Sequence, residues 1–364
     1  MWALAALVVL IIIAVLAFLS YRAMRQQQVA RTLAIHSPRG IDEAMFVNIG
    51  GIDQWVHIRG EDRDNPVILV LHGGMAMSYM AFTPAFQPWE KSFTVVQWDR
   101  RGVGKTFGRN GAKGSGEVTL DRSIDDGVEL ADYLRRHLRK DKIILLGHSM
   151  GSQIGISMAA RRPDLFYAYV GTEQIVDMKR NEAMSYQVIL DRLRAAHRDK
   201  AVARLQRLGP PPYRTAMDWG VKQSLGEIAD PTYGDAMKNR MGPMLRYSPD
   251  YTLGDLFNFV AANPFMASKL FPQWMAFDAH KLGTRFGTPI FMIQGEADVL
   301  TPTPLVVEWL NTVEAPQKAW LPIHAGHLAL MVASDQFLHE LVTHVRPLAM
   351  PQAAPRPQLT KAAG

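Results

Sequence analysis

The chain has 364 residues, no cysteine and a formal net charge of +6. The absence of cysteine excludes disulfide bonds and a thiol nucleophile, and no basic–aromatic pattern of the kind that binds nucleic acid is present. No Cys/His spacing indicates a metal site and no glycine-rich phosphate loop indicates a nucleotide, so we expect neither a metal nor another cofactor. The length suits one domain of roughly 205 residues with additional segments.

The N-terminal segment Trp2–Leu19 is predicted to form a transmembrane helix. Its 18 residues carry no charge and would span about 27 Å as a helix, close to the thickness of the hydrocarbon core of a bilayer. Trp2 and Tyr21 suit the two membrane interfaces. A cleaved signal peptide would carry a basic residue before a shorter apolar run. We therefore expect an uncleaved anchor at 1–21, followed by a polar linker at 22–40.

The charges that follow this segment predict its orientation. Arg22, Arg25 and Arg31 all lie after the apolar run, and the positive-inside rule then places the rest of the chain on the cytoplasmic side. At the other end of the chain, residues 347–364 are rich in Pro, Ala and Gln, which predicts a disordered tail.

Apolar runs typical of buried strands recur in two parts of the chain, 41–174 and 281–346. Helix-compatible segments lie between them, and this alternation predicts an α/β fold with a mostly parallel sheet and helices on both faces. From 175 to 280 the strands stop and helical segments take over, which predicts a helical insertion between the two parts. The clearest strand runs are 66–71, 142–146, 165–170, 288–294 and 318–323.

A sharp turn is predicted where the run 142–146 ends in Gly147-His148-Ser149-Met150-Gly151. A helix-compatible segment follows at once, so Ser149 would lie at the apex between a strand and a helix. Such a turn strains the backbone at the serine and requires its neighbours two places away to lack a Cβ. The free N–H groups of the helix would face an oxyanion formed at Ser149. A glycine-bounded turn without chemistry is the alternative interpretation.

An acid and a histidine follow in the order that a serine nucleophile needs. Asp298 ends the loop after the run 288–294, and His327 follows the run 318–323 after a turn that Gly326 permits. They are 29 positions apart, enough for one crossover helix between parallel strands, so both should lie at the same sheet edge as Ser149.

His324 is the alternative to His327 as the histidine of this triad, and Glu296 is the alternative to Asp298 as its acid.

A candidate oxyanion hole follows the strand run 66–71. His72-Gly73-Gly74-Met75 ends this strand, and its glycines would let the backbone of Gly74 approach a substrate oxygen, with Gly73 beside it. The N–H of Met150, the residue after the nucleophile, would be the second donor. A strand-ending turn is again the structural alternative.

These features together resemble the α/β-hydrolase superfamily and, within it, the proline iminopeptidase (prolyl aminopeptidase) group of serine peptidases. The resemblance implies the fold, with 175–280 as a helical cap inserted after the sixth strand, and a serine hydrolase that acts through an acyl-enzyme. Met75 stands where the group usually has Pro, and Met150 where it often has Trp, so a preference for N-terminal proline stays open. The resemblance runs from Ser37 to Arg346 and includes Gly50–Gln54, His72–Gly74, Asp99–Gly104, Gly147–Ser152, Gly295–Asp298 and His324–His327.

Three functions fit this sequence: an aminopeptidase acting on short peptides, a carboxylesterase or lipase-like enzyme acting near the bilayer, and a non-catalytic ligand-binding protein. The substrate is accordingly a short peptide or a small molecule. Glu173, after the strand run 165–170, would face the same crevice as Ser149. Its carboxylate would bind the ammonium group of a peptide N-terminus. The alternatives for Glu173 are a structural role in the cap and replacement of Asp298 as the acid.

Overall fold

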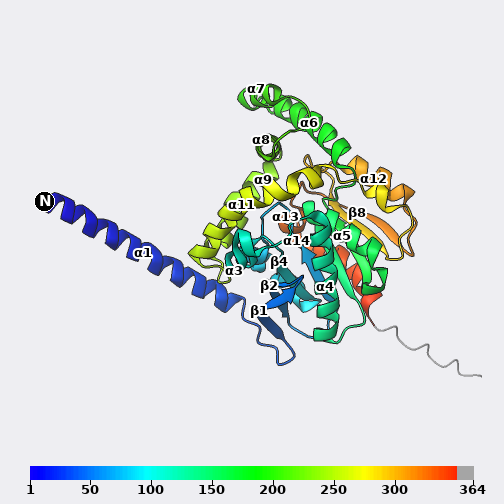
Figure 1. The fold of residues 1–364 in the computed structure, drawn as a ribbon, viewed down its shortest axis with the longest axis horizontal. Helices are drawn as coiled ribbons and strands as arrows, with labels where there is room; N and C mark the ends of the chain where they lie inside the picture. Colours follow the sequence, from blue (N-terminus) through cyan, green and yellow to red (C-terminus); the bar gives the residue numbers. More distant parts are fainter. Residues whose placement is uncertain (351–364) are drawn as a thin grey trace, which may run out of the picture.

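The computed structural model describes residues 1–350; the part of the predicted tail at 351–364 lies outside the described residues. An eight-stranded sheet has the order β1-β2-β4-β3-β5-β6-β7-β8 (Figure 1). β1 is antiparallel to β2 and β2 to β4, and all other neighbours are parallel. The mostly parallel sheet is therefore confirmed. The strands are β1 Ile41–Ile49, β2 Ile52–Gly60, β3 Val67–Leu71, β4 Thr94–Asp99, β5 Ile143–His148, β6 Phe166–Thr172, β7 Ile290–Gly295 and β8 Lys318–Ile323.

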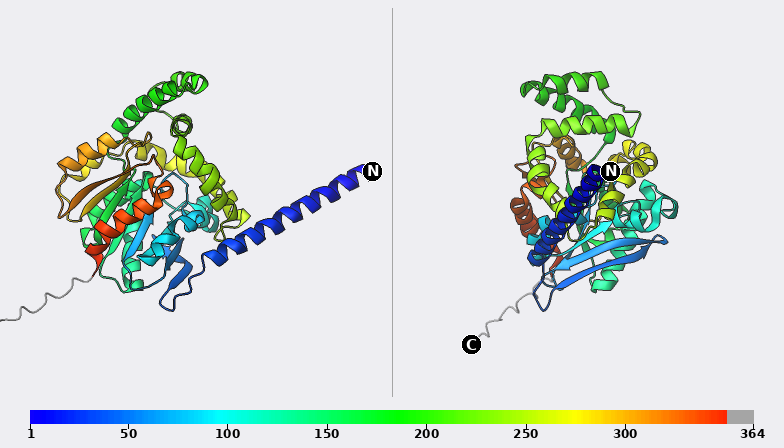
Figure 2. Two further views of the ribbon diagram at one scale, coloured as in Figure 1. Left: turned by 180° about the vertical axis from the view of Figure 1, so that it is seen from behind. Right: turned by 90° about the vertical axis from the view of Figure 1, so that its left-hand side faces the viewer.

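Helices cover both faces of the sheet, because the central strands are apolar on both sides (Figure 2). Along β3, Leu69 and Leu71 belong to one hydrophobic cluster with side chains of α4, α5 and α12, whereas Ile68 and Val70 belong to another with side chains of α2, α13 and α14. This alternation is the period of two of a strand. The helices of this part are α2 Thr83–Phe86, α3 Gly104–Gly114, α4 Leu120–Leu138, α5 Met150–Arg161, α12 Thr303–Thr312, α13 Ala329–Val332 and α14 Ser334–Glu340.

A helical cap lies between β6 and β7, as predicted. Its first two long helices, α6 and α7, project from the rest of the molecule (Figure 1). Leu193, Leu205 and Leu225 of α6, α7 and α8 form a small hydrophobic cluster with Leu300. The cap helices are α6 Met178–Ala195, α7 Asp199–Leu208, α8 Ala216–Ala229, α9 Pro231–Ala236, α10 Gly242–Tyr247 and α11 Leu253–Met275.

The N-terminal helix α1 runs from Trp2 to Thr32 and projects far from the body (Figure 1). It is the one helix of the described residues that is long and apolar enough to cross a membrane. The expectation of a linker at 22–40 is wrong up to Thr32, because the helix continues without a break. Arg22 and Gln26 explain the continuation, since their side chains donate hydrogen bonds to backbone carbonyls of the cap.

The expectation of a disordered tail from 347 onward is wrong at 347–349. Residues Arg346–Ala349 form a short 3-10 helix. The Arg346 guanidinium donates to the carbonyl of Ser92 at 3.0 Å and thereby holds this segment against the domain.

A buried ion pair ties the N-terminal hairpin to the sheet. Asp126 of α4 is fully buried and accepts hydrogen bonds from Arg101 at 2.7 Å, Arg122 at 2.8 Å and Gln54 at 2.9 Å. Arg101 also donates to the carbonyl of Gly50 in the β1–β2 turn. The network explains why the turn and the loop after β4 keep their polar residues in a buried position.

Asp126→Ala should destabilise the domain by about 3 kcal/mol, because it leaves Arg101 buried and unpaired. Asp125→Ala is the matched control, since Asp125 pairs with Arg161 at an exposed site and exposed pairs contribute about 1 kcal/mol or less. The thermal midpoints of the two variants, measured by scanning fluorimetry in detergent, give the comparison. Equal midpoints would contradict this account of the network.

Candidate active site

Ser149 lies at a strained turn between β5 and α5, as the sequence predicted. Its backbone has φ 50° and ψ −122°, a conformation that costs free energy in a non-glycine residue. Gly147 and Gly151 make the turn possible, because a Cβ on Gly151 would lie 2.3 Å from the carbonyl oxygen of Leu71 and one on Gly147 would lie 2.8 Å from Cα of Ser152. The N-terminus of α5 therefore starts directly behind the Ser149 hydroxyl.

The structure brings the three predicted side chains together in one hydrogen-bonded chain. Nε2 of His327 lies 3.0 Å from Oγ of Ser149, and Nδ1 of His327 lies 2.9 Å from Oδ2 of Asp298. The other Asp298 oxygen accepts the backbone N–H groups of Leu300 and Thr301 at 2.7 and 3.1 Å. The imidazole is thus oriented by a fixed carboxylate and positioned to take the serine proton.

Burial and charge set opposite pKa shifts on the acid and the base. Burial alone would raise the pKa of Asp298, but the charge and hydrogen bond of His327, with the hydrogen bonds from Thr301, hold it below its ordinary value. Burial alone would lower the pKa of His327, but Asp298 raises it, helped by Glu173 and Asp230. Asp298 therefore stays ionised beside His327, and its charge is positioned to stabilise an imidazolium at His327.

The alternative acid and base of the sequence prediction lie elsewhere. The His324 side chain is 98% exposed and the Glu296 side chain is 53% exposed, and Nδ1 of His324 lies 3.7 Å from Oε2 of Glu296. Asp298 and His327 are buried next to Ser149.

The predicted oxyanion loop lies beside Ser149. Gly73, Gly74 and Met150 line the same cavity as the Ser149 side chain. A Cβ on Gly73 would lie 2.6 Å from the His148 ring, and Gly74 has φ +67°, so both positions favour glycine.

Sequence reasoning missed the side chain that fixes this loop. The Arg100 guanidinium donates to the carbonyls of His72 at 3.0 Å and Gly74 at 2.6 Å. Burial lowers the pKa of Arg100 to about 9. These bonds fix two carbonyl groups of the glycine loop beside Ser149.

Glu173 does not enter the cavity. It is fully buried, accepts hydrogen bonds from the hydroxyl of Thr172 and the backbone N–H of Gly295, and lies 3.2 Å from Nε2 of His148. The Tyr79 hydroxyl lies 2.5 Å from Nδ1 of the same imidazole, within hydrogen-bonding distance. The prediction that Glu173 follows β6 is correct, but its carboxylate joins the ends of β5, β6 and β7 behind the nucleophile.

The cavity above Ser149 has a volume of about 680 Å³ and lies between the cap and the sheet edge. Glu227 of α8 is the one carboxylate among its lining residues, and most of the others are apolar. Burial raises the pKa of Glu227, and the neighbouring Tyr233 and His327 partly offset this rise. A cationic group bound in the cavity would therefore be met by one half-buried acid. The sequence offered no signal for Glu227 beyond its place in the cap.

The cap also contacts the histidine loop directly. Oδ2 of Asp230 accepts the backbone N–H of His327 at 3.3 Å, and Oδ1 caps the N-terminus of α9. A Cβ on Gly326 would lie 1.9 Å from the Asp230 carboxylate. Gly326 is thus needed for this close approach of cap and core.

Comparison with known proteins places this geometry in a family. The model of the alpha/beta hydrolase fold family matches residues 66–334. The chain is 26% identical over 305 residues to the probable aminopeptidase YbaC of Bacillus subtilis, covering 82% of this chain and 95% of that protein. It is 25% identical over 196 residues to a proline iminopeptidase of Saccharolobus solfataricus, covering 54% and 55% of the two chains.

Solved structures show the same fold. A crystal structure of a membrane phospholipase A, described as a bacterial virulence factor, superposes with a TM-score of 0.63 at 16% identity, covering 95% of this chain and 98% of the other. A proline iminopeptidase-related protein of Thermus thermophilus superposes with a TM-score of 0.57 at 17% identity, covering 85% and 99%. At these identities the likeness concerns the fold alone.

The reactivity of Ser149 should depend on pH through His327. The pKa of His327 is raised above its ordinary value. The neutral imidazole, the form able to accept a proton, is therefore lost as the pH falls through a midpoint above that ordinary value. Covalent labelling by a fluorophosphonate should follow this midpoint. In Asp298→Asn the carboxylate no longer raises the pKa, so the midpoint should fall and the labelling rate should drop by about 10⁴.

Glu296→Gln is the control and should leave both the midpoint and the rate unchanged, because Glu296 lies outside the hydrogen-bonded chain. An unchanged midpoint in Asp298→Asn would show that another group controls the titration.

Proposed function

The chain belongs to the α/β-hydrolase superfamily and is a hydrolase, and from this premise we propose that it is a membrane-anchored, proline-iminopeptidase-like aminopeptidase acting on short peptides. The hydrogen-bonded chain Ser149–His327–Asp298 at the floor of the cavity carries the proposal. Ser149 attacks the scissile carbonyl as His327 takes its proton, and the N–H groups of Gly74 and Met150 receive the oxyanion. His327 then protonates the leaving amine, and water deacylates the enzyme by the reverse path.

The half-buried acid in the cavity favours a substrate with a free amino terminus. Glu227 would pair with that ammonium group and thereby place the scissile bond one residue from the amino terminus. The curated relatives named above support this choice, since an aminopeptidase and a proline iminopeptidase are among them. In this proposal Glu227 takes the role expected of Glu173.

A second candidate function is a carboxylesterase acting near the membrane. The largely apolar lining of the cavity, which includes Met75, Met77, Trp219 and Phe259, favours it, because such a lining suits an acyl chain. The two functions share Ser149 chemistry and differ in whether Glu227 meets a charged group.

The anchor is the second part of the proposal. Trp2–Leu19 carries no charge, and its side chains are exposed along the projecting half of α1. Exposure of such a run to water is unfavourable, whereas insertion into a bilayer removes its apolar surface from water. The three arginines that follow favour the cytoplasmic side for the hydrolase domain.

Glu227→Gln should raise the KM for aminoacyl anilides by about 10- to 100-fold, as expected for loss of a charge-assisted contact. It should leave short acyl esters and N-acetylated anilides nearly unchanged. Glu296→Gln is the matched control outside the cavity, and Ser149→Ala gives the background rate. Turnover of acyl esters with no activity on free aminoacyl anilides would support the esterase instead.

The full chain should stay in the membrane fraction through a carbonate wash, because Trp2–Leu19 would have to enter water to leave it. Sequencing of the N-terminus in that fraction should find the apolar run intact. Recovery of a soluble form that lacks its first residues would instead indicate a cleaved signal peptide.

A further inference from the structure

The projecting part of the cap is strongly basic. We define the basic arm as residues 191–208, the end of α6 and all of α7. It holds six Lys or Arg residues against two Asp, and all six cations are exposed. Within residues 1–350, only Arg194 among them has an acidic partner within 4 Å, Asp191 at 3.8 Å. The six cations are Arg192, Arg194, Arg198, Lys200, Arg204 and Arg207.

A second part of the cap exposes apolar side chains on one helix face. Leu253, Phe257 and Val260 of α11 are 43%, 71% and 68% exposed. Their spacing of four and three residues places them in one stripe, which Pro264 and Ala267 continue to the cavity above Ser149. The opposite face of α11 is buried in the core. We call these three exposed residues the α11 stripe.

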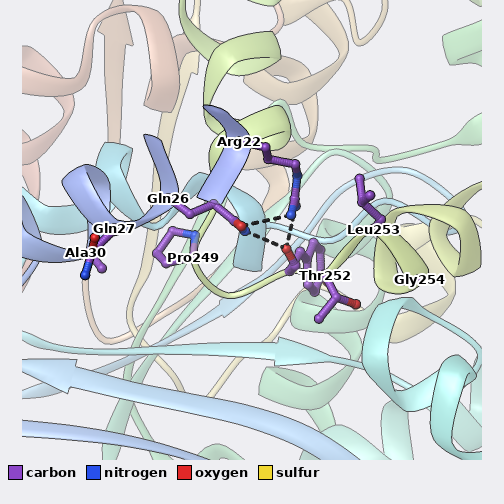
Figure 3. Close-up of a pocket in the computed structure, with 9 residues that line it drawn as sticks. Arg22, Gln26, Gln27, Ala30, Pro249, Thr252, Leu253 and Gly254 are labelled. Carbon is purple, nitrogen blue, oxygen red and sulfur yellow. Dashed lines mark hydrogen bonds between the residues drawn. The ribbon is translucent and has the colours of Figure 1, made fainter. Parts of the chain in front are cut away.

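The contact between α1 and the cap gives the position of these surfaces relative to the bilayer. Arg22, three residues after Leu19, donates to the carbonyls of Tyr251 at 2.8 Å and Arg246 at 3.2 Å. Figure 3 shows Arg22 and Gln26 of α1 next to the loop that carries Pro249 and Thr252. Gln26 donates to the carbonyl of Ser248 at 2.6 Å. The loop that begins α11 therefore lies next to the point where the apolar run of α1 ends.

Aromatic side chains lie next to this contact between α1 and the cap. The rings of Tyr21 and Tyr247 meet edge to face with centroids 6.0 Å apart, and Arg25 lies over the ring of Tyr247 at 5.3 Å. Tyrosine is enriched at the boundary between lipid and water. The ribbon views show the basic arm extending from the cap toward the side of the molecule on which α1 projects (Figures 1 and 2).

We propose that the cap rests on the surface of a bilayer that contains anionic phospholipid. The basic arm contacts the lipid headgroups and the α11 stripe enters the interface beside α1. The charge of the arm is complementary to an anionic leaflet, and the stripe begins at the loop that Arg22 and Gln26 of α1 contact. This inference rests on that anchor and is independent of the substrate of the enzyme.

The absence of native cysteine allows the contact to be mapped on the full chain with single introduced thiols. Arg204→Cys reports on the basic arm, Phe257→Cys on the α11 stripe and Leu10→Cys on the anchor. Arg136→Cys, exposed on α4, is the control outside the proposed contact. Each variant carries a fluorophore in nanodiscs whose lipids bear a headgroup-attached quencher, with phosphatidylcholine alone or with phosphatidylglycerol added.

Quenching at Arg204→Cys and Phe257→Cys should exceed that at Arg136→Cys several-fold in the anionic nanodiscs. At the arm it should increase with phosphatidylglycerol and fall in about 1 M salt, where the Debye length is about 3 Å. Reversing two arm charges by Arg198→Glu and Lys200→Glu should remove it. Arg161→Glu with Arg162→Glu makes the same change of charge at the end of α5 and should leave the quenching unchanged. The comparison applies when both double variants keep the thermal midpoint of the parent protein.

Quenching at the arm and the stripe no greater than at Arg136→Cys, with Leu10→Cys still quenched, would overturn the cap contact and leave the anchor in place. The arm would then serve some other partner, such as an acidic protein. Failure to quench Leu10→Cys would overturn the anchor and this inference together. Quenching at the arm that changes neither with lipid charge nor with salt concentration would overturn the electrostatic part of the proposal.

Discussion

The backbone crowding at Ser149 is the constraint on which the rest of the site depends. The turn brings the first residues of α5 so close to the end of β3 that a side chain on Gly151 would collide with the carbonyl of Leu71. The same closeness puts Gly73 and Gly74, which follow β3, next to the nucleophile. The strain at Ser149 persists because packing on both sides over-determines it, so the hydroxyl, the helix N-terminus and the glycine loop share one fixed edge of the sheet.

The histidine loop is held by three contacts, one of which comes from the cap. The position of the proposed base therefore depends on the position of the cap. Asp298 orients the ring of His327, Asp230 of the cap accepts its backbone N–H, and Nε2 of His148 lies 3.0 Å from its carbonyl oxygen. A movement of the cap that displaced Asp230 would therefore change the position of the proposed base. Such backing contacts determine how accurately a reacting side chain is placed.

The sequence predicted the elements whose signals are local. Buried strands appear as apolar runs bounded by glycine, and the positions of Ser149, Asp298 and His327 follow from strand ends that must share an edge. The remainder depends on contacts between segments distant in sequence. Arg100 reaches back to the glycine loop, Glu227 enters the cavity from the cap, and the helix at 22–32 is held by the loop before α11. Glu173 was correctly located after β6, but nothing local indicates that its carboxylate accepts the N–H of Gly295.

Tyr251 connects the anchor, the cap and the core through its two ends. Its carbonyl accepts Arg22 of α1, and its hydroxyl donates to Asp99 at the end of β4 at 2.8 Å. Burial raises the pKa of Asp99 to about 6, against the hydrogen bonds from Ser78, Lys105 and Tyr251 that favour the charged form. In the proposed membrane-anchored form, a flexible linker at 22–40 would let the domain rotate relative to the bilayer. Because α1 is instead helical to Thr32 and Arg22 is bonded to Tyr251, insertion of α1 would give the hydrolase domain and its cavity one orientation toward the bilayer.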